Sequence, residues 1–271
     1  MNEKRKAMRP IVSRVLLSVA VVAGVTLGGP IAGTAHAAAT AMPRTTVVLV
    51  HGAFADGSGW NKVIPLLQGR GLNVVSIQNP LTSLADDVAA TRRVLDAQHG
   101  PVVLVGHSWG GVVISEAGAH ESVRSLVYVA ALAPSEGQSV ADLTEGYPVA
   151  PGSKYLVQDK DGFLTLSPEG VAKHFGQDLP AAETRLMTVT QGPIRASAFG
   201  EKVKHAAWRD RPTWFVLTQR DHMIDPGLQQ AMARSISAHV VSLPTSHVPQ
   251  LSKPAQVAQV IIDAAAPQAG R

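Results

Sequence analysis

The chain of 271 residues contains no cysteine, which excludes disulfide bonds and any thiol nucleophile. Aromatic residues make up only 4% of the chain, and they are not interleaved with a basic patch of the kind that binds nucleic acid. A glycine-rich phosphate-binding loop is also missing, so we expect no cofactor. Without disulfides the fold depends on its apolar core, and the roughly 230 residues beyond the N-terminal segment are enough to form one.

The N-terminal segment has the pattern of an export signal. Five basic residues lie between positions 4 and 14, and an apolar stretch without charge follows at 15–29. Pro30 ends this stretch, and Ala35-His36-Ala37 offers a small-x-small cleavage site. A membrane anchor is the alternative, but the stretch is shorter than the roughly 20 residues of a spanning helix. We expect residues 1–37 to be a cleaved signal, residues 38–271 to be the mature domain, and the protein to be secreted or periplasmic.

The formal charge of +4 comes from the same N-terminal segment, in which five basic residues outnumber one acidic residue, Glu3. The mature domain is therefore close to neutral, and the high isoelectric point does not indicate nucleic-acid binding. We expect a small-molecule substrate, no nucleic-acid partner and no membrane span after removal of the signal.

Predicted strands and helices alternate along most of the mature domain, which is typical of the α/β class with a mostly parallel sheet flanked by helices. Residues 133–211 interrupt this alternation, and we expect them to form an inserted cap over one edge of the sheet. Their apolar side chains either line an acyl or alcohol pocket or simply pack the cap on the core. Strands are expected at 45–50, 72–78, 101–107, 123–132, 213–219 and 239–244, and helices at 58–69, 83–98, 109–119, 227–237 and 253–265.

The predicted helix 83–98 has an apolar stripe that includes Leu84 and Val88. Asp86 and Asp87 follow the helix start, where carboxylates are favoured by the helix dipole. We expect both carboxylates to face water.

A Gly-x-Ser-x-Gly motif at residues 106–110 lies between a β-branched strand and an apolar helix, the layout of a nucleophile elbow. Such a turn forces strained backbone angles on Ser108 and lifts its hydroxyl clear of the sheet at a helix start. The neighbouring His107 is expected to be a packing residue. We interpret Ser108 as the nucleophile.

A serine nucleophile needs a base, and the base needs an acid to orient it. Asp221 and His247 each lie in a loop after a predicted strand, where the acid and the base are required. Asp225, which precedes a proline, is the alternative acid, but it has the pattern of a helix cap. A metal site formed by Asp221, His222 and Asp225 lacks recognised ligand spacing, so we expect no metal.

The first strand ends in a His-Gly turn at residues 51–52, and this loop can present a main-chain N–H toward the nucleophile. We assign the oxyanion-hole donors to the N–H groups of Ala53 and Trp109. Phe54 is the alternative donor if the loop is offset by one residue, and its side chain is expected to contact substrate.

These segments together resemble the α/β-hydrolase superfamily, and within it the branch of plant methylesterases, hydroxynitrile lyases and related bacterial esterases. The resemblance is carried by residues 48–54 with Trp60, the Ser108 motif and the loops of Asp221 and His247, and it is weak in the middle third. It implies an α/β-hydrolase fold and a Ser-His-Asp esterase that cleaves carboxylic esters through an acyl-enzyme.

Similar lyases carry threonine after the first strand's histidine and lysine after the catalytic histidine. Gly52 and Val248 occupy those positions here, so the resemblance favours ester hydrolysis over the lyase reaction. A lactonase, a cofactor-free peroxidase and a non-catalytic ligand-binding protein remain as alternatives on the same fold, because the fold alone does not fix the function.

Overall fold

The structure, a computed structural model, describes residues 44–266. The predicted export signal at residues 1–37 lies outside the described residues, and so do residues 267–271.

A six-stranded sheet in the order β2-β1-β3-β4-β8-β9 forms the centre of the domain, and every neighbouring pair is parallel. Its inner strands consist largely of β-branched residues buried on both faces, as parallel strands between two helical layers must be. The strands are β1 Thr46–Val50, β2 Asn73–Ser76, β3 Val102–His107, β4 Val123–Val129, β8 Thr213–Thr218 and β9 His239–Leu243.

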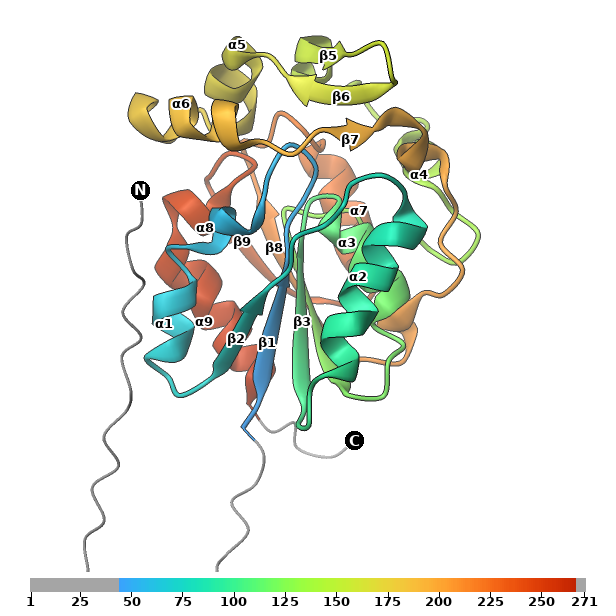
Figure 1. The fold of residues 1–271 in the computed structure, drawn as a ribbon, viewed down its shortest axis with the longest axis vertical. Coiled ribbons are helices and arrows are strands. Elements are labelled where there is room, and N and C mark those ends of the chain that lie inside the picture. Colours follow the sequence, from blue (N-terminus) through green and yellow to red (C-terminus); the bar gives the residue numbers. More distant parts are fainter. Residues whose placement is uncertain (1–43, 267–271) are drawn as a thin grey trace, which may run out of the picture. The chain divides into compact units, whose positions relative to one another are not determined.

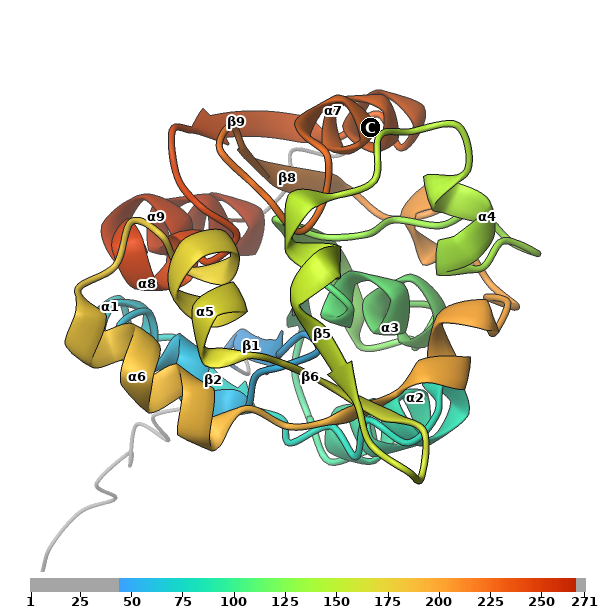
Figure 2. The same cartoon turned by 90° about the horizontal axis from the view of Figure 1, so that it is seen from above.

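Alternate side chains of the strands enter two separate cores. Val48 and Val50 pack with α2, α3 and α7, whereas Val47 and Leu49 pack with α1 and α9 on the opposite face. Figure 2 shows these two groups of helices on either side of the sheet. The expected α/β class and α/β-hydrolase fold are confirmed. The helices are α1 Ile64–Gln68, α2 Leu84–Asp96, α3 Gly110–Ala117, α7 Pro226–Ser235, α8 Pro249–Ser252 and α9 Pro254–Ala265.

One expected helix is divided in the structure, and another is preceded by an additional short helix. The segment predicted as helix 58–69 begins with a 3-10 turn, η1 Gly57–Trp60, capped by the Asp56 side chain, and α1 follows after a turn. The helix expected at 253–265 is present as α9, and the separate short helix α8 precedes it, with Lys253 between them at φ −136° and ψ 53°, outside the helical region. Prolines at the first turns of α1, α8 and α9 favour these separate helix starts.

The chain between β4 and β8 contains short helices and a three-stranded antiparallel sheet in the order β5-β6-β7. Figure 1 shows this part above the carboxyl ends of the central strands. Its elements are α4 Val140–Thr144, η2 Pro151–Tyr155, β5 Leu156–Gln158, β6 Phe163–Leu166, α5 Pro168–Gly170, η3 Val171–Phe175, α6 Ala181–Thr190, β7 Ile194–Arg195, η4 Ala196–Gly200 and η5 Ala207–Arg209.

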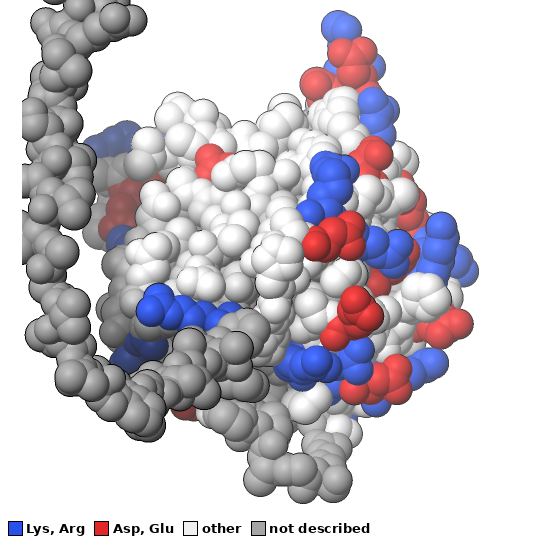
Figure 3. Space-filling view, turned by 60° about the horizontal axis from the view of Figure 1, so that its bottom comes forward, with Lys and Arg blue, Asp and Glu red and all other residues white. Residues whose placement is uncertain are grey.

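On the right-hand side of the face in Figure 3, basic and acidic side chains are interspersed rather than separated into patches of one sign. Within residues 44–266, none of the helices combines the length and the apolar character needed to cross a bilayer.

Candidate active site

Ser108 occupies a sharp turn between β3 and α3, with a φ of +51° that non-glycine residues rarely adopt. The turn depends on glycines at close approaches of the backbone. A Cβ at Gly106 would lie 2.5 Å from the carbonyl oxygen of Gly110, and a Cβ at Gly110 would lie 2.5 Å from that of Val50. The motif therefore consists of glycines because no side chain fits where strand and helix pass each other.

Asp221 and His247 are brought together by the loops that follow the neighbouring parallel strands β8 and β9. Nδ1 of His247 lies 2.8 Å from Oδ2 of Asp221, and both side chains are buried. A carboxylate accepts the Nδ1 proton, which leaves Nε2 of the neutral ring free to act as a base.

The Asp221 carboxylate is held by further donors. The Thr218 hydroxyl and the Gln229 amide each donate to Oδ2 at 2.8 Å, and the backbone N–H groups of Met223 and Ile224 donate to Oδ1. Burial by itself would raise the pKa of Asp221, but the neighbouring imidazole and these hydrogen bonds lower it below its usual value. The carboxylate is therefore ionised and oriented.

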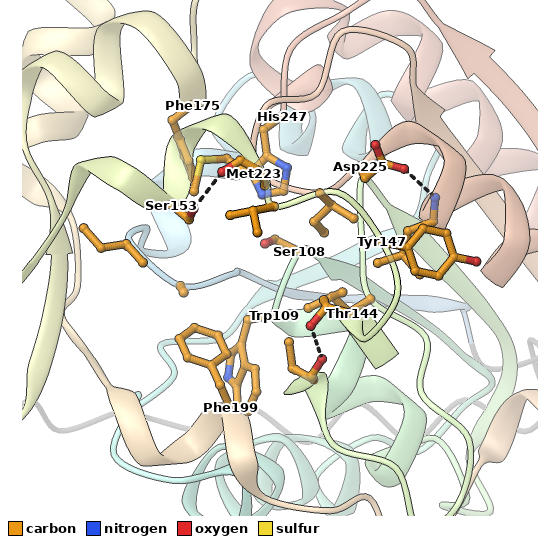
Figure 4. Close-up of a pocket in the computed structure, with 18 of the residues that line it drawn as sticks. Ser108, Trp109, Thr144, Tyr147, Ser153, Phe175, Phe199, Met223, Asp225 and His247 are labelled. Carbon is orange, nitrogen blue, oxygen red and sulfur yellow. Dashed lines mark hydrogen bonds between the residues drawn. The ribbon is translucent and has the colours of Figure 1, made fainter. Parts of the chain in front are cut away.

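Ser108 and His247 line the same cavity, and Figure 4 shows both side chains there. Within the described residues, no hydrogen bond joins the Ser108 hydroxyl to the imidazole. Hydrogen bonds of this kind are often long without substrate and tighten in the reacting complex.

His107, the residue before the nucleophile, supports His247 through the main chain. Its Nε2 donates to the carbonyl oxygen of His247 at 2.8 Å, and its ring has edge contacts with Trp60 and Phe175. Burial and the neighbouring His247 lower the pKa of His107 to about 3, so the ring stays neutral. His107 is a packing residue, as expected, and it also fixes the backbone of His247.

The N–H groups of Ala53 and Trp109 make no hydrogen bond within the described part of the chain, and both residues line the cavity beside Ser108. The loop that carries Ala53 is fixed by His51, whose Nδ1 donates to the Gly52 carbonyl while Nε2 accepts from the N–H of Asn79. These two free donors near the nucleophile could stabilise an oxyanion. Phe54 follows with a φ of +59° and also lines the cavity.

The expectation that Asp87 faces water is wrong, whereas Asp86 is exposed. The Asp87 side chain is buried, and its Oδ2 accepts a hydrogen bond of 2.7 Å from the indole N–H of Trp109. Its other oxygen accepts from the N–H of Leu81 at 2.8 Å. Asp87 lies three residues after Leu84 and therefore on the buried stripe of α2, a signal that the sequence contained.

We expect Asp87→Asn to change how stability depends on pH. Burial, as the largest cause, raises the pKa of Asp87 to about 6, so between about pH 4 and 6 the folded chain binds a proton that the unfolded chain has lost. Wild-type stability therefore falls as the pH rises through this window, whereas the variant has no such titration. In denaturant titrations, the free energy of unfolding of the variant relative to that of wild type should increase by on the order of 3 kcal/mol between about pH 4 and pH 7.

The control is Asp86→Asn, at the exposed neighbouring position. Hydrogen bonds from Thr82 and Ser83 lower the pKa of Asp86, so this variant should lose stability relative to wild type as the pH rises. If the free energy of unfolding depended on pH in the same way for Asp87→Asn and wild type, the raised pKa of Asp87 would be contradicted.

The alternative residues of the acid loop have other partners. Asp225 caps α7 and accepts a hydrogen bond from the N–H of Leu228 at 3.0 Å. His222 faces His174, with their Nδ1 atoms 3.2 Å apart, and not the carboxylate of Asp221. The interpretation of Asp225 as a helix cap therefore agrees with the structure.

The cavity at Ser108 has a volume of about 300 Å³ and a largely apolar lining. From the chain between β4 and β8 come Tyr147, Leu156, Phe175 and Phe199, whereas Trp208 instead donates to the carbonyl of Pro134. Within the described residues, neither lysine nor arginine lines this cavity. Such a cavity fits an uncharged, apolar group beside the nucleophile.

Comparison with known proteins gives a consistent result. A model described as the alpha/beta hydrolase family matches residues 47–260. A pyrethroid hydrolase from Sphingobium wenxiniae is 26% identical over 82% of this chain and 88% of its own length. A putative chloroplastic methylesterase, number 14, of Arabidopsis thaliana is 27% identical over 80% of this chain and 71% of its own.

A solved structure of a pyrethroid hydrolase from Sphingobium faniae superposes with a TM-score of 0.70 at 24% identity, covering 82% of this chain and 97% of that one. At this identity the likeness concerns the fold. The resemblance expected from the sequence motifs is confirmed by the family match and by the methylesterase relative.

Proposed function

The chain belongs to the alpha/beta hydrolase family, and from that premise we propose that it is a serine esterase that cleaves uncharged carboxylic esters. One observation carries the proposal: a buried Asp221–His247 pair lies in the same cavity as a serine on a strained elbow. Esterase and hydrolase relatives support the reaction class.

In the first half of the proposed reaction, Nε2 of His247 takes the hydroxyl proton as Oγ of Ser108 attacks the ester carbonyl carbon. The carbonyl oxygen becomes an oxyanion, which accepts hydrogen bonds from the N–H groups of Ala53 and Trp109. Each such donor lowers the barrier by on the order of 3 kcal/mol. The C–O bond to the alcohol then breaks, and His247 returns its proton to the leaving oxygen.

In the second half, a water molecule replaces the alcohol. His247 takes a proton from this water as its oxygen attacks the acyl carbon, and the bond to Ser108 breaks as the serine regains a proton. The acid is released and the enzyme is restored. Asp221 stays ionised throughout, because it fixes the tautomer of His247 and stabilises the imidazolium. The cycle needs no metal and no cofactor.

The test is hydrolysis of p-nitrophenyl esters of graded acyl length by the purified protein, with Ser108→Ala as the control. The apolar cavity of about 300 Å³ favours short to medium acyl chains. Absence of turnover with every ester would overturn the proposal and favour a protein that only binds ligands.

The position of Gly52 supports hydrolysis rather than the lyase reaction. A Cβ at this residue would lie 2.7 Å from Cβ of Ser108 and 3.0 Å from the carbonyl oxygen of His107, so the threonine of the lyases does not fit this backbone. Val248, at the position of their lysine, is a buried core residue.

We expect Gly52→Ala to lower kcat for p-nitrophenyl esters by about tenfold or more, because even a small displacement of the nucleophile disturbs its geometry. The matched control is Gly200→Ala at the end of η4, where a Cβ would meet nothing within 4 Å and the residue lines neither cavity of the site. An unchanged kcat for Gly52→Ala would show that the loop accommodates a side chain without moving Ser108.

Export from the cytoplasm is part of the proposal. It is supported by the basic segment, the apolar stretch at 15–29 and the possible cleavage site before residue 38.

A further inference from the structure

A second cavity, of about 340 Å³, lies beside the catalytic one and has no role in the mechanism above. It is formed by the loop after β1, by α6 and by the chain that follows His247. Figure 1 shows α6 over α8, and Lys62 links these parts through Glu183 on α6 and the carbonyl of Leu251 on α8. The lining includes Ala55, Asp56, Lys62, Leu186, Met187 and Leu251.

Two aromatic residues, Phe54 and Phe175, line both cavities and therefore form a shared wall. The ring of Phe175 packs against two histidine rings, with its centroid 5.1 Å from that of His247 and 6.3 Å from that of His107. His107 and Val248 also line the second cavity. The second cavity therefore lies on the far side of Phe175, the ring that contacts His247, whereas Ser108 and His247 themselves line the first cavity.

The direction of proton transfer decides which half of an ester points toward this wall. His247 has to reach the leaving oxygen, so the alcohol must extend on the His247 side of the scissile bond. In Figure 4, Ser108 lies between His247 with Phe175 on one side and Trp109 with Phe199 on the other. The acyl chain is therefore directed toward Trp109 and Phe199, and the alcohol toward Phe175.

We propose that the second cavity receives the alcohol half of bulky esters, entering past Phe54 and Phe175. The inference rests on the proposed esterase function and specifies its substrate class. A volume of about 340 Å³ is at the lower end of small-molecule sites, which suits an alcohol with one or two rings and is far larger than methanol requires.

The charges around the second cavity define the alcohol further. Lys62 is engaged by both carboxylate oxygens of Glu183, and within the described residues Asp56 has no lysine or arginine partner. The three side chains together carry an excess of negative charge, while Leu186, Met187 and Leu251 supply apolar surface. The cavity therefore favours uncharged or cationic aromatic alcohols and disfavours anionic ones.

The test fills the cavity by Met187→Trp and compares two butyrate esters, ethyl butyrate and 2-naphthyl butyrate. Met187 is partly buried in the lining, and a larger side chain there should exclude the naphthyl group. We expect kcat/KM for the naphthyl ester to fall about tenfold or more, mainly through KM, while the value for ethyl butyrate stays within about twofold. Comparing variant with wild type cancels the different reactivities of the leaving groups.

The matched control is Val189→Trp, the same substitution on the same helix at a side chain that is 78% exposed and lines neither cavity. This variant should leave kcat/KM unchanged for both esters. Because a larger side chain at Met187 could also disturb folding, ethyl butyrate activity reports on the intact catalytic centre. As a second measurement, 2-naphthol should bind the Ser108→Ala protein, and Met187→Trp in that background should weaken this binding about tenfold.

An equal loss for both esters, or no loss for either, would overturn the inference. So would a loss confined to ethyl 2-naphthoate, in which the ring is on the acyl side. If the wild type hydrolyses none of these esters, the proposed function fails and the inference fails with it. If it hydrolyses ethyl butyrate and Met187→Trp leaves naphthyl discrimination and naphthol binding unchanged, the inference alone is wrong.

Discussion

Replacing Ser108 by alanine should abolish the hydrolysis of short p-nitrophenyl esters, with kcat reduced by on the order of 10⁵- to 10⁶-fold. Oγ of Ser108 is the atom that bonds to the acyl group in the acyl-enzyme, and no other group in the mechanism substitutes for it. Alanine lacks only this oxygen, so the elbow and the two free N–H donors should be preserved. The measurement is the release of p-nitrophenol at saturating ester, together with an unfolding curve that shows an intact fold.

Ser153→Ala is the matched comparison, because Ser153 also lines the catalytic cavity but its hydroxyl donates to the carbonyl of Ala150 at 2.7 Å. This variant should keep activity within about tenfold of wild type, since a hydroxyl without a neighbouring base is a poor nucleophile. Full activity in Ser108→Ala would assign the nucleophile elsewhere.

His247→Gln is expected to lower kcat by at least about 10⁴-fold. Glutamine can still donate to Oδ2 of Asp221, but it cannot accept the serine proton and return it to the alcohol. Single-turnover release of p-nitrophenol should show that acylation itself becomes slow, because the base is needed in the first step.

His222→Gln provides the control for this prediction. His222 lies in the neighbouring acid loop, and its ring faces His174 rather than the nucleophile, so its replacement should have an effect of about tenfold at most. A loss of only a few-fold in His247→Gln would mean that another group acts as the base.

Local patterns predicted the three residues of the candidate triad, although they are far apart along the chain. Ser108 is marked by glycines that permit a backbone crossing, Asp221 follows the buried strand β8, and His247 follows the edge strand β9. Because the carboxyl ends of parallel strands meet at one edge of the sheet, residues placed after these strands converge there. The parallel pairing of the strands and their order in the chain therefore determine the approximate position of the site.

The local pattern predicted the wrong environment for Asp87, because a carboxylate near a helix start is stabilised by the helix dipole and is usually solvated. Here the indole of Trp109 and the N–H of Leu81 supply partners that compensate for burial. Those partners come from other segments, so the sequence of α2 alone could not decide between the two environments.

The sequence by itself determined the α/β class, the strand positions and the residue types of the proposed chemistry, since periodicity and turn glycines act over a few residues. The tertiary structure alone decided the shape of the two cavities, the wall of Phe54 and Phe175 and the burial of Asp87. The wall joins segments more than a hundred residues apart in the chain, and Asp87 is buried against Trp109, 22 residues away. No local preference specifies such packing.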